Sequence, residues 1–379
     1  MDAALIVSPP PEAQILTVNV GSSSVKLDLV DLSCHDERAP NTSLHLPHRD
    51  IEPGAAIRQL TAAAAIDPSA LAAIGHRLVH GGTLVTTPLR LTNKLDSRLD
   101  ELAQLAPLHN PITLAWIRAV RQDFPGLPQI LVPDTGFFSD LPTVSRQYAL
   151  PADLTARHGL RRYGFHGLAH ESMLRQWLAH GSTAVRIITL QLGAGCSMAA
   201  IADGRPIDTS MGFSPLEGLM MATRSGDVDA GLVTWLQKTE SLSPAETEAM
   251  LNERSGLLGV SRTSADVAEL LQDRSDEARL AIDMYVYRAR KYLGAYMVAL
   301  GGVDAILFGG GVGEHVPGIR QRICGDMSWC GVEIDRELND RVLGTSTKIS
   351  SPGSTAEVGV VRVDEARILA EHAARISWI

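Results

Sequence analysis

Short apolar runs that end in glycine-rich or small polar turns recur along this chain of 379 residues, and they constrain its fold most. Residues 15–20 and 25–30 are two such runs, and Gly21-Ser-Ser-Ser24 between them predicts a hairpin with polar groups at its tip. Further strands are predicted at residues 129–132, 186–192, 198–201, 305–308 and 358–363. Strands that alternate with helices indicate an α/β class.

The longest predicted helix spans residues 277–300, where Ile282, Val286 and Leu293 keep a helical period, and we expect it to be a core helix. A terminal helix is predicted over residues 364–374. A strand followed by glycine occurs at both Asn19 and Leu192, as a duplicated fold would leave it, although periodicity alone does not establish a duplication.

Length and charge narrow the class of protein. A chain of 379 residues predicts two or three domains. Because 34 Lys and Arg stand against 43 Asp and Glu, and no basic helix or tail is present, nucleic acid is not expected as a partner.

Residues 1–14 have no basic segment and read as a frayed leader instead of a signal peptide, and the apolar stretch 297–312 is interrupted by Asp304 and glycines. We therefore expect a cytoplasmic protein with no membrane contact. Four separated cysteines predict neither a disulfide nor a zinc site.

Residues 208–227 follow neither a helical nor a strand period. Their turn formers, which include Pro215 and Gly218, fix the backbone shape around a single arginine, Arg224. A segment of this kind is typical of a binding or catalytic site.

The same segment resembles the signature of the acetate kinase family, and four further motifs occur in that family's order. They are Asn19-Val-Gly-Ser-Ser-Ser-Val-Lys26, His76-Arg-Leu-Val-His-Gly-Gly82, Arg161-Arg-Tyr-Gly-Phe-His-Gly167 and Gly309-Gly-Gly-Val-Gly-Glu314. The chain is identified on these motifs as a member of that family, and the resemblance runs from about Ile15 to the final helix.

The resemblance implies a two-domain fold of the actin and sugar-kinase type, related to ribonuclease H, with a nucleotide cleft between the domains. Residues 1–135 with 365–379 would form the N-terminal domain on the acyl and phosphate side. Residues 136–364 would form a C-terminal domain for nucleotide binding and dimerisation, which implies a homodimer.

Catalytic roles are implied for four residues. Phosphoryl transfer needs groups that hold two charged reactants in line and neutralise charge on the equatorial oxygens. Arg77, Arg224 and His166 match the family residues that contact the transferring phosphoryl group, and Asp134 matches the one that orients the substrate. Read without the motifs, the same residues would be structural salt bridges, a core histidine and a turn-forming aspartate.

Nucleotide and metal contacts are implied by the same resemblance. Asn19 and Glu365 match the residues near the metal, Mg²⁺ or Mn²⁺, that accompanies ATP and ADP. The residues implied in phosphate and nucleotide binding are Asn19, Ser22, Ser24, Lys26, Gln191, Leu192, Gly193, Ala194, Gly195, Asp266, Gly310, Gly311, Val312, Gly313 and Glu314.

An apolar acyl pocket is implied at Val79, Leu108, Phe165 and Pro215. Their small combined volume fits an acid of two or three carbons. One methylene in such a pocket changes binding by only about 1 to 3 kcal/mol, so acetate and propionate both remain open.

The chain departs from the family pattern on the nucleotide side. It has Gln191-Leu-Gly-Ala-Gly-Cys-Ser197 where the family has His-Leu-Gly-Asn-Gly-Ser-Ser, and it has Leu168-Ala169, Ala268 and His315 where the family has Thr-Ser, Arg and Asn. We interpret these differences as lying around the cleft. Because Ala194 carries no hydrogen-bonding side chain, weaker nucleotide binding is predicted.

The expected reaction is reversible, direct in-line phosphoryl transfer from ATP to acetate, giving ADP and acetyl phosphate. Three further possibilities stay open: a kinase of propionate or another short-chain acid, a kinase with another donor such as pyrophosphate, and a catalytically weak paralogue that binds nucleotide or acyl phosphate.

Overall fold

The computed structural model describes residues 14–21, 24–33, 42–47, 52–106 and 109–377. The chain divides into two compact units, here called unit 1 (residues 1–139 and 364–379) and unit 2 (residues 140–363). Residues 1–13 of the expected N-terminal leader lie outside the described residues, and its last residue, Gln14, begins a strand. No helix within the described ranges has both the length and the apolar character that a membrane crossing needs.

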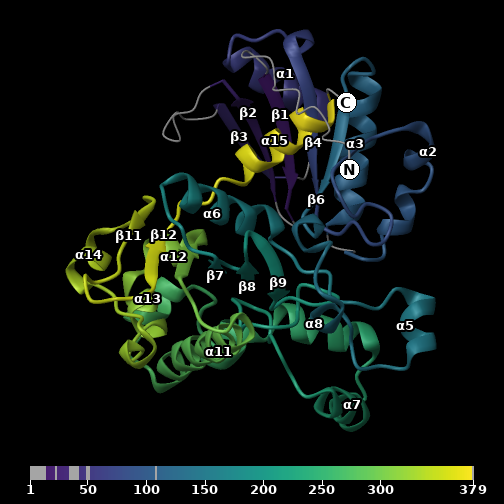
Figure 1. The fold of residues 1–379 in the computed structure, drawn as a ribbon. Coiled ribbons are helices and arrows are strands. Elements are labelled where there is room, and N and C mark those ends of the chain that lie inside the picture. The colour runs from purple at the N-terminus through teal and green to yellow at the C-terminus, as the bar shows by residue number, and fades with distance from the viewer. Residues whose placement is uncertain (1–13, 22–23, 34–41, 48–51, 107–108, 378–379) are drawn as a thin grey trace. The chain divides into compact units, whose positions relative to one another are not determined.

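Unit 1 is built on a six-stranded sheet with the order β3-β2-β1-β4-β6-β5 (Figure 1). Its strands are β1 (Gln14–Val20), β2 (Ser24–Asp31), β3 (Thr42–Pro47), β4 (Leu71–Leu78), β5 (Leu89–Arg90) and β6 (Gln129–Pro133). Its helices are α1 (Pro53–Ala63), α2 (Asn93–Asp96), α3 (Asn110–Asp123) and α15 (Glu365–Ser377).

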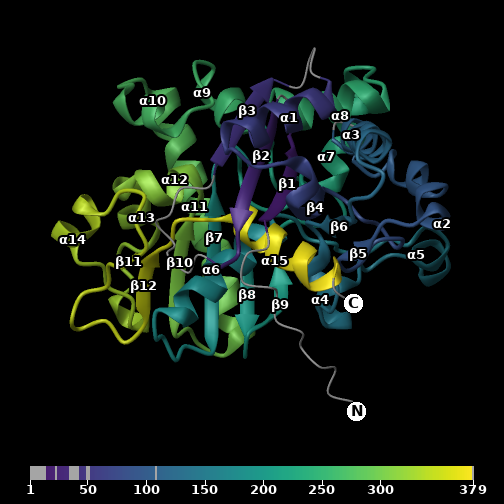
Figure 2. The ribbon, with the colours of Figure 1, turned by 90° about the horizontal axis from the view of Figure 1, so that it is seen from above.

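Helices cover both faces of this sheet. Alternate residues of β1, among them Leu16 and Val18, pack with Ile57 of α1 and Trp116 of α3 in one buried cluster. Helix α15 lies across the other face, over β1, β4 and β6 (Figure 2). Gly75 in β4 permits this approach, because a Cβ atom there would lie 3.0 Å from Cβ of Ala373 in α15.

Unit 2 has its own six-stranded sheet with the order β11-β12-β10-β7-β8-β9. Its strands are β7 (Arg186–Leu192), β8 (Cys196–Ala202), β9 (Arg205–Thr209), β10 (Ala305–Gly309), β11 (Thr347–Lys348) and β12 (Glu357–Val360). Its helices are α4 (Thr143–Arg146), α5 (Ala152–His158), α6 (Gly167–Ala179), α7 (Ala230–Thr239), α8 (Pro244–Glu253), α9 (Gly256–Ser261), α10 (Val267–Gln272), α11 (Asp276–Leu300), α12 (Gly310–His315), α13 (Pro317–Ile323) and α14 (Arg336–Arg341).

The two sheets repeat one topology. In each, three consecutive strands form an antiparallel meander, the fourth strand lies parallel to the first, the sixth lies parallel to the fourth, and the fifth pairs antiparallel with the sixth at the edge. The duplication suggested by the turns after Asn19 and Leu192 is therefore present in the fold. The expected α/β class is confirmed.

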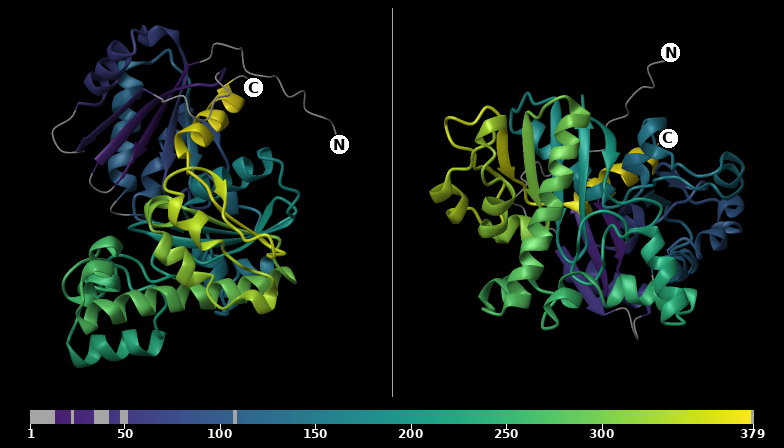
Figure 3. Two further views of the ribbon diagram at one scale, coloured as in Figure 1. Left: turned by 90° about the vertical axis from the view of Figure 1, so that its left-hand side faces the viewer. Right: turned by 90° about the horizontal axis from the view of Figure 1, so that it is seen from below.

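The sheet of unit 2 also carries helices on both sides. Helix α6 packs on β7 and β10, and α11 packs on β7 and β8. Ser275 caps α11 by accepting from the Ala278 amide, and Gly301 ends the helix in a left-handed conformation. Helices α9 and α10 pack on α11, and the left view of Figure 3 shows a group of green helices at one end of the long helix.

Most predicted elements are confirmed within one or two residues, and two boundaries need correction. The predicted core face of α11 is buried at Ile282, Val286 and Leu293, whereas Leu280, Met284 and Tyr287 are exposed. The strand predicted at residues 358–363 ends at Val360 as β12. The first two residues of the 208–227 segment belong to β9, and its remainder is irregular as expected.

The buried histidine His76 is expected to make the stability of the fold depend on pH. His76 in β4 is fully buried, and its Nε2 lies 2.8 Å from the side-chain amide of Gln129. Burial lowers the pKa of His76 to about 4. The unfolded chain, with a histidine pKa near 6.5, therefore binds more protons than the folded chain between pH 6.5 and 4, and stability falls as the pH is lowered through that window.

The loss attributable to His76 should reach about 3 kcal/mol at pH 4, which follows from a shift of about 2.5 pKa units. Urea unfolding of the wild type and of His76→Gln at pH 7.5, 6.5, 5.5 and 4.5 would measure it. The variant should lose less stability than the wild type across this range. Parallel curves for the two proteins would contradict the assignment.

Candidate active site

Three neighbouring parallel strands of unit 1 bring Asn19, Arg77 and Asp134 together at their carboxyl ends. Asn19 is near the end of β1, Arg77 is near the end of β4, and Asp134 directly follows β6. Arg77 donates from Nη2 to Asp134 Oδ2 at 2.7 Å and from Nη1 to Asn19 Oδ1 at 3.1 Å. The carboxyl edge of an α/β sheet is where such folds place reacting groups.

Glu365 joins this group from the first turn of α15. Asn19 points to the α15 face of the sheet, and its Nδ2 donates to Glu365 Oε2 at 3.2 Å. Burial raises the pKa of Glu365, Arg77 opposes that rise, and the Asp134 carboxylate adds to it. Burial disfavours the charge of Arg77, but Asp134 and Glu365 outweigh it and raise its pKa. The group is a compact set of opposite charges within unit 1.

This donor set fits a hard divalent cation. Mg²⁺ is usually held by one or two carboxylates and completes its shell with water and substrate phosphates. The described residues contain no cluster of three or more His, Cys, Asp or Glu side chains. Glu365 and Asp134 supply two carboxylates, and a bound cation would stabilise the charged form of Glu365, which burial and the Asp134 carboxylate disfavour by raising its pKa.

Lys26 and Ser24, also implied as site residues of unit 1, have partners of their own. Lys26 pairs with Asn19 across β1 and β2, and its Nζ lies 3.3 Å from Asp28 Oδ1. Ser24 Oγ lies 2.8 Å from His45 Nε2. Val79 is buried after β4. Ser22 and Leu108 lie outside the described residues.

In unit 2, His166 and Arg224 face the same glycine turn. His166 sits at the N-cap of α6 with a left-handed backbone, φ 58°. A Cβ atom placed on Gly195 would lie 3.3 Å from Cε1 and Nε2 of His166 and 3.5 Å from Nη1 of Arg224. Imidazole and guanidinium donors thus flank the backbone between β7 and β8.

Arg224 has no carboxylate within ion-pair distance among the described residues. Its Nη1 donates to the Pro215 carbonyl at 3.2 Å, and burial lowers its pKa. A partly buried cation without an anionic partner is costly, and an anionic ligand would relieve that cost. Arg224 therefore marks an anion site in unit 2.

A polar network that sequence reasoning missed holds the segment carrying Arg224. Arg162 donates to Glu217 Oε1 at 2.6 Å and to the carbonyls of Thr209, Ser210 and Met211. Tyr148 donates to the same carboxylate and accepts from the Phe213 amide. Arg162 directly precedes Tyr163-Gly-Phe-His166 in the sequence. This position next to His166 was the only sequence signal that could have indicated the network.

The segment 191–197 and the glycine run 309–314 meet at neighbouring strand ends. Gln191 in β7 pairs with Gly309 in β10, and a Cβ atom on Gly310 would lie 2.6 Å from the Leu192 carbonyl oxygen and 2.8 Å from Gln191 Nε2. Gly193 donates its amide to the Gly195 carbonyl at 3.1 Å, and Ala194 is exposed. Backbone groups of both turns share one edge of the sheet.

The glycine run on this edge forms the short helix α12 from Gly310 onward. Glu314 is buried, and its Oε1 accepts from the amides of Gly310 and Val363 at 3.1 Å, which argues against a nucleotide contact by this carboxylate. The Gly313 carbonyl is bound by Arg320, whereas Gly311 is exposed and Val312 is half-buried.

Other nucleotide-side residues also have structural roles. Asp266 caps α10 by accepting from the amides of Ala268 and Glu269. Leu168 and Ala169 are buried core residues of α6, and the expectation that they lie around the cleft stays a prediction. Phe165 is buried and Pro215 is half-buried, both in unit 2, and the acyl pocket stays a prediction.

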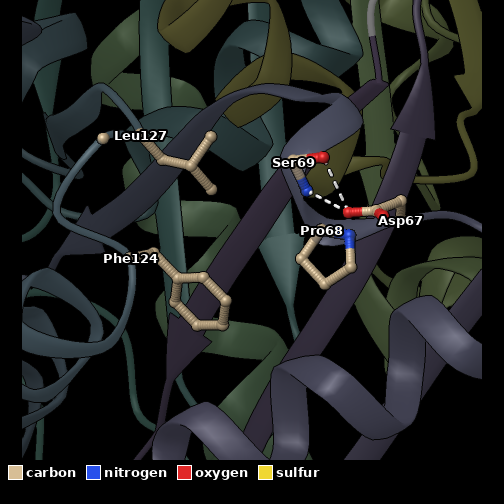
Figure 4. Close-up of a pocket in the computed structure, with 6 residues that line it drawn as sticks. Asp67, Pro68, Ser69, Phe124 and Leu127 are labelled. Carbon is tan, nitrogen blue, oxygen red and sulfur yellow. Dashed lines mark hydrogen bonds between the residues drawn. The ribbon is translucent and has the colours of Figure 1, made fainter.

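A surface pocket of unit 1 lies away from Arg77 and Asp134 of the same unit. It has a volume of about 480 Å³ and is lined by Asp67, Pro68, Ser69, Phe124, Gly126 and Leu127 (Figure 4). These residues precede β4 and β6, at the opposite strand ends from Arg77 and Asp134. This position separates the pocket from the candidate site, and within it the Asp67 carboxylate accepts from the Ser69 amide and hydroxyl.

Comparison with known proteins identifies the family. The sequence profile of the Acetokinase family matches residues 46–371. The chain belongs to the acetokinase family. The acetate kinase of Solibacter usitatus is 40% identical over 95% of this chain and 97% of its own length. That of Bacteroides thetaiotaomicron is 38% identical over 94% of this chain and 98% of its own.

Solved structures of an acetate kinase and of a propionate kinase share the fold. The crystal structure of Porphyromonas gingivalis acetate kinase matches with a TM-score of 0.87 at 36% identity, over 96% of this chain and 99% of that one. A propionate kinase from Francisella tularensis matches with a TM-score of 0.85 at 31% identity, over 95% and 98%. The family assignment, the fold class and the expectation of a kinase are confirmed.

Proposed function

We propose that the chain transfers the γ-phosphoryl group of ATP to acetate and releases ADP and acetyl phosphate, reversibly and by direct in-line displacement. Family membership supports the reaction class. The main support for placing the site here is Arg224. Its half-buried guanidinium lies beside the donor His166 and has no carboxylate partner among the described residues.

In the proposed reaction a carboxylate oxygen of acetate attacks the γ-phosphorus, and the bond from that phosphorus to the bridging oxygen of ADP breaks. Negative charge then spreads over three equatorial oxygens. Arg77, Arg224 and His166 are assigned to these oxygens as hydrogen-bond donors. Asp134 fixes the Arg77 guanidinium through the 2.7 Å ion pair.

Glu365 and Asn19, with Asp134 beside them, would hold Mg²⁺ or Mn²⁺. The bound cation would supply charge neutralisation of the phosphate oxygens. On the nucleotide side we assign the backbone around residues 193–195 and 310–312 to ATP. Because ATP and acetate are cytoplasmic metabolites, we infer a cytoplasmic enzyme.

Propionate is the second candidate acceptor, because the propionate kinase from Francisella tularensis matches nearly the whole chain. ³¹P nuclear magnetic resonance of the purified protein with ATP and Mg²⁺ would distinguish the acids, with acetate or propionate added in separate samples. We expect kcat/KM to be higher for acetate than for propionate, with acetyl phosphate and ADP as the products. Faster turnover of propionate would move the assignment to that acid.

Further samples in the same experiment test a different phosphoryl donor and a loss of catalysis. A sample with pyrophosphate in place of ATP tests the donor. Tight ATP binding by calorimetry without any product would indicate a binding paralogue, the outcome that Ala194 and Ala268 would favour.

We also infer a homodimer formed through unit 2. Leu280, Met284 and Tyr287 line one exposed face of α11 at helical spacing, and Leu232 and Trp235 are exposed on α7. Light scattering should give a molar mass near twice 40.6 kDa. A monomeric mass at micromolar concentration would overturn this inference.

A further inference from the structure

A chain of buried hydrogen bonds runs behind His166. Its Nδ1 lies 2.8 Å from Ser197 Oγ, which lies 2.8 Å from Nε2 of His170. Nδ1 of His170 lies 2.7 Å from Thr189 Oγ1. Thr189, Ser197 and His170 are all fully buried, on β7, β8 and α6. His166 is the N-cap of α6 and His170 lies in the first turn of that helix, so both rings reach the same Ser197 hydroxyl.

The buried hydroxyl of Thr189, at the far end of this chain, determines which atom is the donor in each hydrogen bond. Among the residues that the structure describes, Thr189 Oγ1 has His170 Nδ1 as its hydrogen-bond partner. If His170 donated to Thr189, the threonine proton would be buried without an acceptor, which is costly. Thr189 therefore donates to His170 Nδ1.

The remaining directions follow one from the next. A neutral His170 that accepts at Nδ1 carries its proton on Nε2 and donates it to Ser197 Oγ. The Ser197 hydroxyl is then left to donate to His166 Nδ1. With Nδ1 accepting, the neutral imidazole of His166 carries its proton on Nε2, the atom that faces Gly195 beside Arg224.

We propose that Thr189, His170 and Ser197 are positioning residues that hold His166 in its Nε2–H tautomer and fix its ring plane. The inference rests on the proposed function, in which His166 donates to the transferring phosphoryl group. A complete buried polar chain brings little net stability compared with apolar side chains of the same shape, but it specifies one geometry. That property suits a donor that must be in place before charge develops.

The tautomer can be read without any turnover. Protein labelled with ¹⁵N-histidine, with the His166 signals identified by their loss in His166→Asn, gives the protonation of each ring nitrogen from long-range ¹H–¹⁵N couplings. We expect Nε2–H and an unprotonated Nδ1 in the wild type. Thr189→Val keeps the side-chain shape but removes the hydroxyl, and it should give a mixture of tautomers at His166.

Activity of the same variants separates positioning from packing. Thr189→Val and Ser197→Ala should lower kcat by about 10- to 100-fold, as partners that orient a functional histidine typically do, with KM for ATP and acetate changed less than threefold. Thr189→Ser restores the hydroxyl although it removes a methyl group, and it should recover the Nε2–H tautomer and most of kcat.

A wild-type His166 protonated at Nδ1 would overturn the proposal, and so would an unchanged tautomer in both Thr189→Val and Ser197→Ala. Thr189→Ser failing like Thr189→Val would assign the effect to packing and overturn it as well. If the tautomer behaves as expected but no sample forms an acyl phosphate, the hydrogen-bond chain stands and the proposed function fails.

Discussion

Replacing Arg77 by alanine is expected to lower kcat by about 10³- to 10⁵-fold, the range seen when an arginine that stabilises the charge of phosphoryl transfer is lost. Arg77 is held by Asp134 at 2.7 Å and by Asn19 at 3.1 Å, so its guanidinium is fixed before substrate binds. A fixed donor loses no freedom in the transition state, which is why its removal is so costly. Initial rates with acetate and ATP would measure the effect.

The same substitution also breaks a buried ion pair, so rates must be compared on folded protein. The Asp134 side chain is 1% exposed and that of Arg77 is 13% exposed, and a broken buried pair costs about 3–5 kcal/mol. In Arg77→Ala the buried Asp134 carboxylate loses this ion pair. The double variant Arg77→Ala/Asp134→Asn also removes that carboxylate, and it should recover stability but not activity. Arg98→Ala, which breaks an exposed pair with Glu101 in the same unit, should stay within twofold of the wild type. Activity of Arg77→Ala within tenfold of the wild type would contradict the assigned role.

Replacing Arg320 by methionine is expected to cost unit 2 about 3–5 kcal/mol of stability, the range for stranding the partners of a buried charge. Arg320 in α13 is fully buried, and burial lowers its pKa to about 10, so it remains charged at neutral pH. It donates to the carbonyls of Gly313 and Glu314 at the end of α12, to those of Asn339 and Val342 at the end of α14, and to the Asn339 side chain. One side chain thus satisfies the ends of two helices.

Differential scanning calorimetry would measure the loss as a lower transition temperature for unit 2. The matched control is Arg322→Ala on the same helix, where a partly exposed side chain pairs with Asp283 on the surface. That variant should change stability by less than about 1 kcal/mol. Equal effects of the two substitutions would contradict the role given to Arg320.

The sequence predicted the central strands because their largely apolar runs are short and bounded by turn residues, as at β7 and β10. Strand β4 was missed, although it carries Arg77. Its residues Ala72, Ala73 and Gly75 have low strand preference, and His76 reads as polar while it is fully buried. Pairing with β1 and β6, which no local pattern encodes, makes this segment a strand.

Two features of the site lay beyond sequence reasoning. Helix α12 forms in a glycine run of poor helix propensity, because Glu314 accepts from the Gly310 amide and Arg320 binds its last carbonyls. The hydrogen-bond chain behind His166 joins residues of α6, β7 and β8. The four-residue spacing of His166 and His170 was its only trace in the sequence.

The most direct test of the account is trapping of acyl phosphate as hydroxamate when the purified protein is incubated with acetate, ATP and Mg²⁺, beside Arg77→Ala and Arg224→Ala. The account predicts steady formation of acetyl hydroxamate by the wild type and rates at least about 10³-fold lower in both variants. A folded wild type that binds ATP but forms no hydroxamate with acetate or propionate would contradict it.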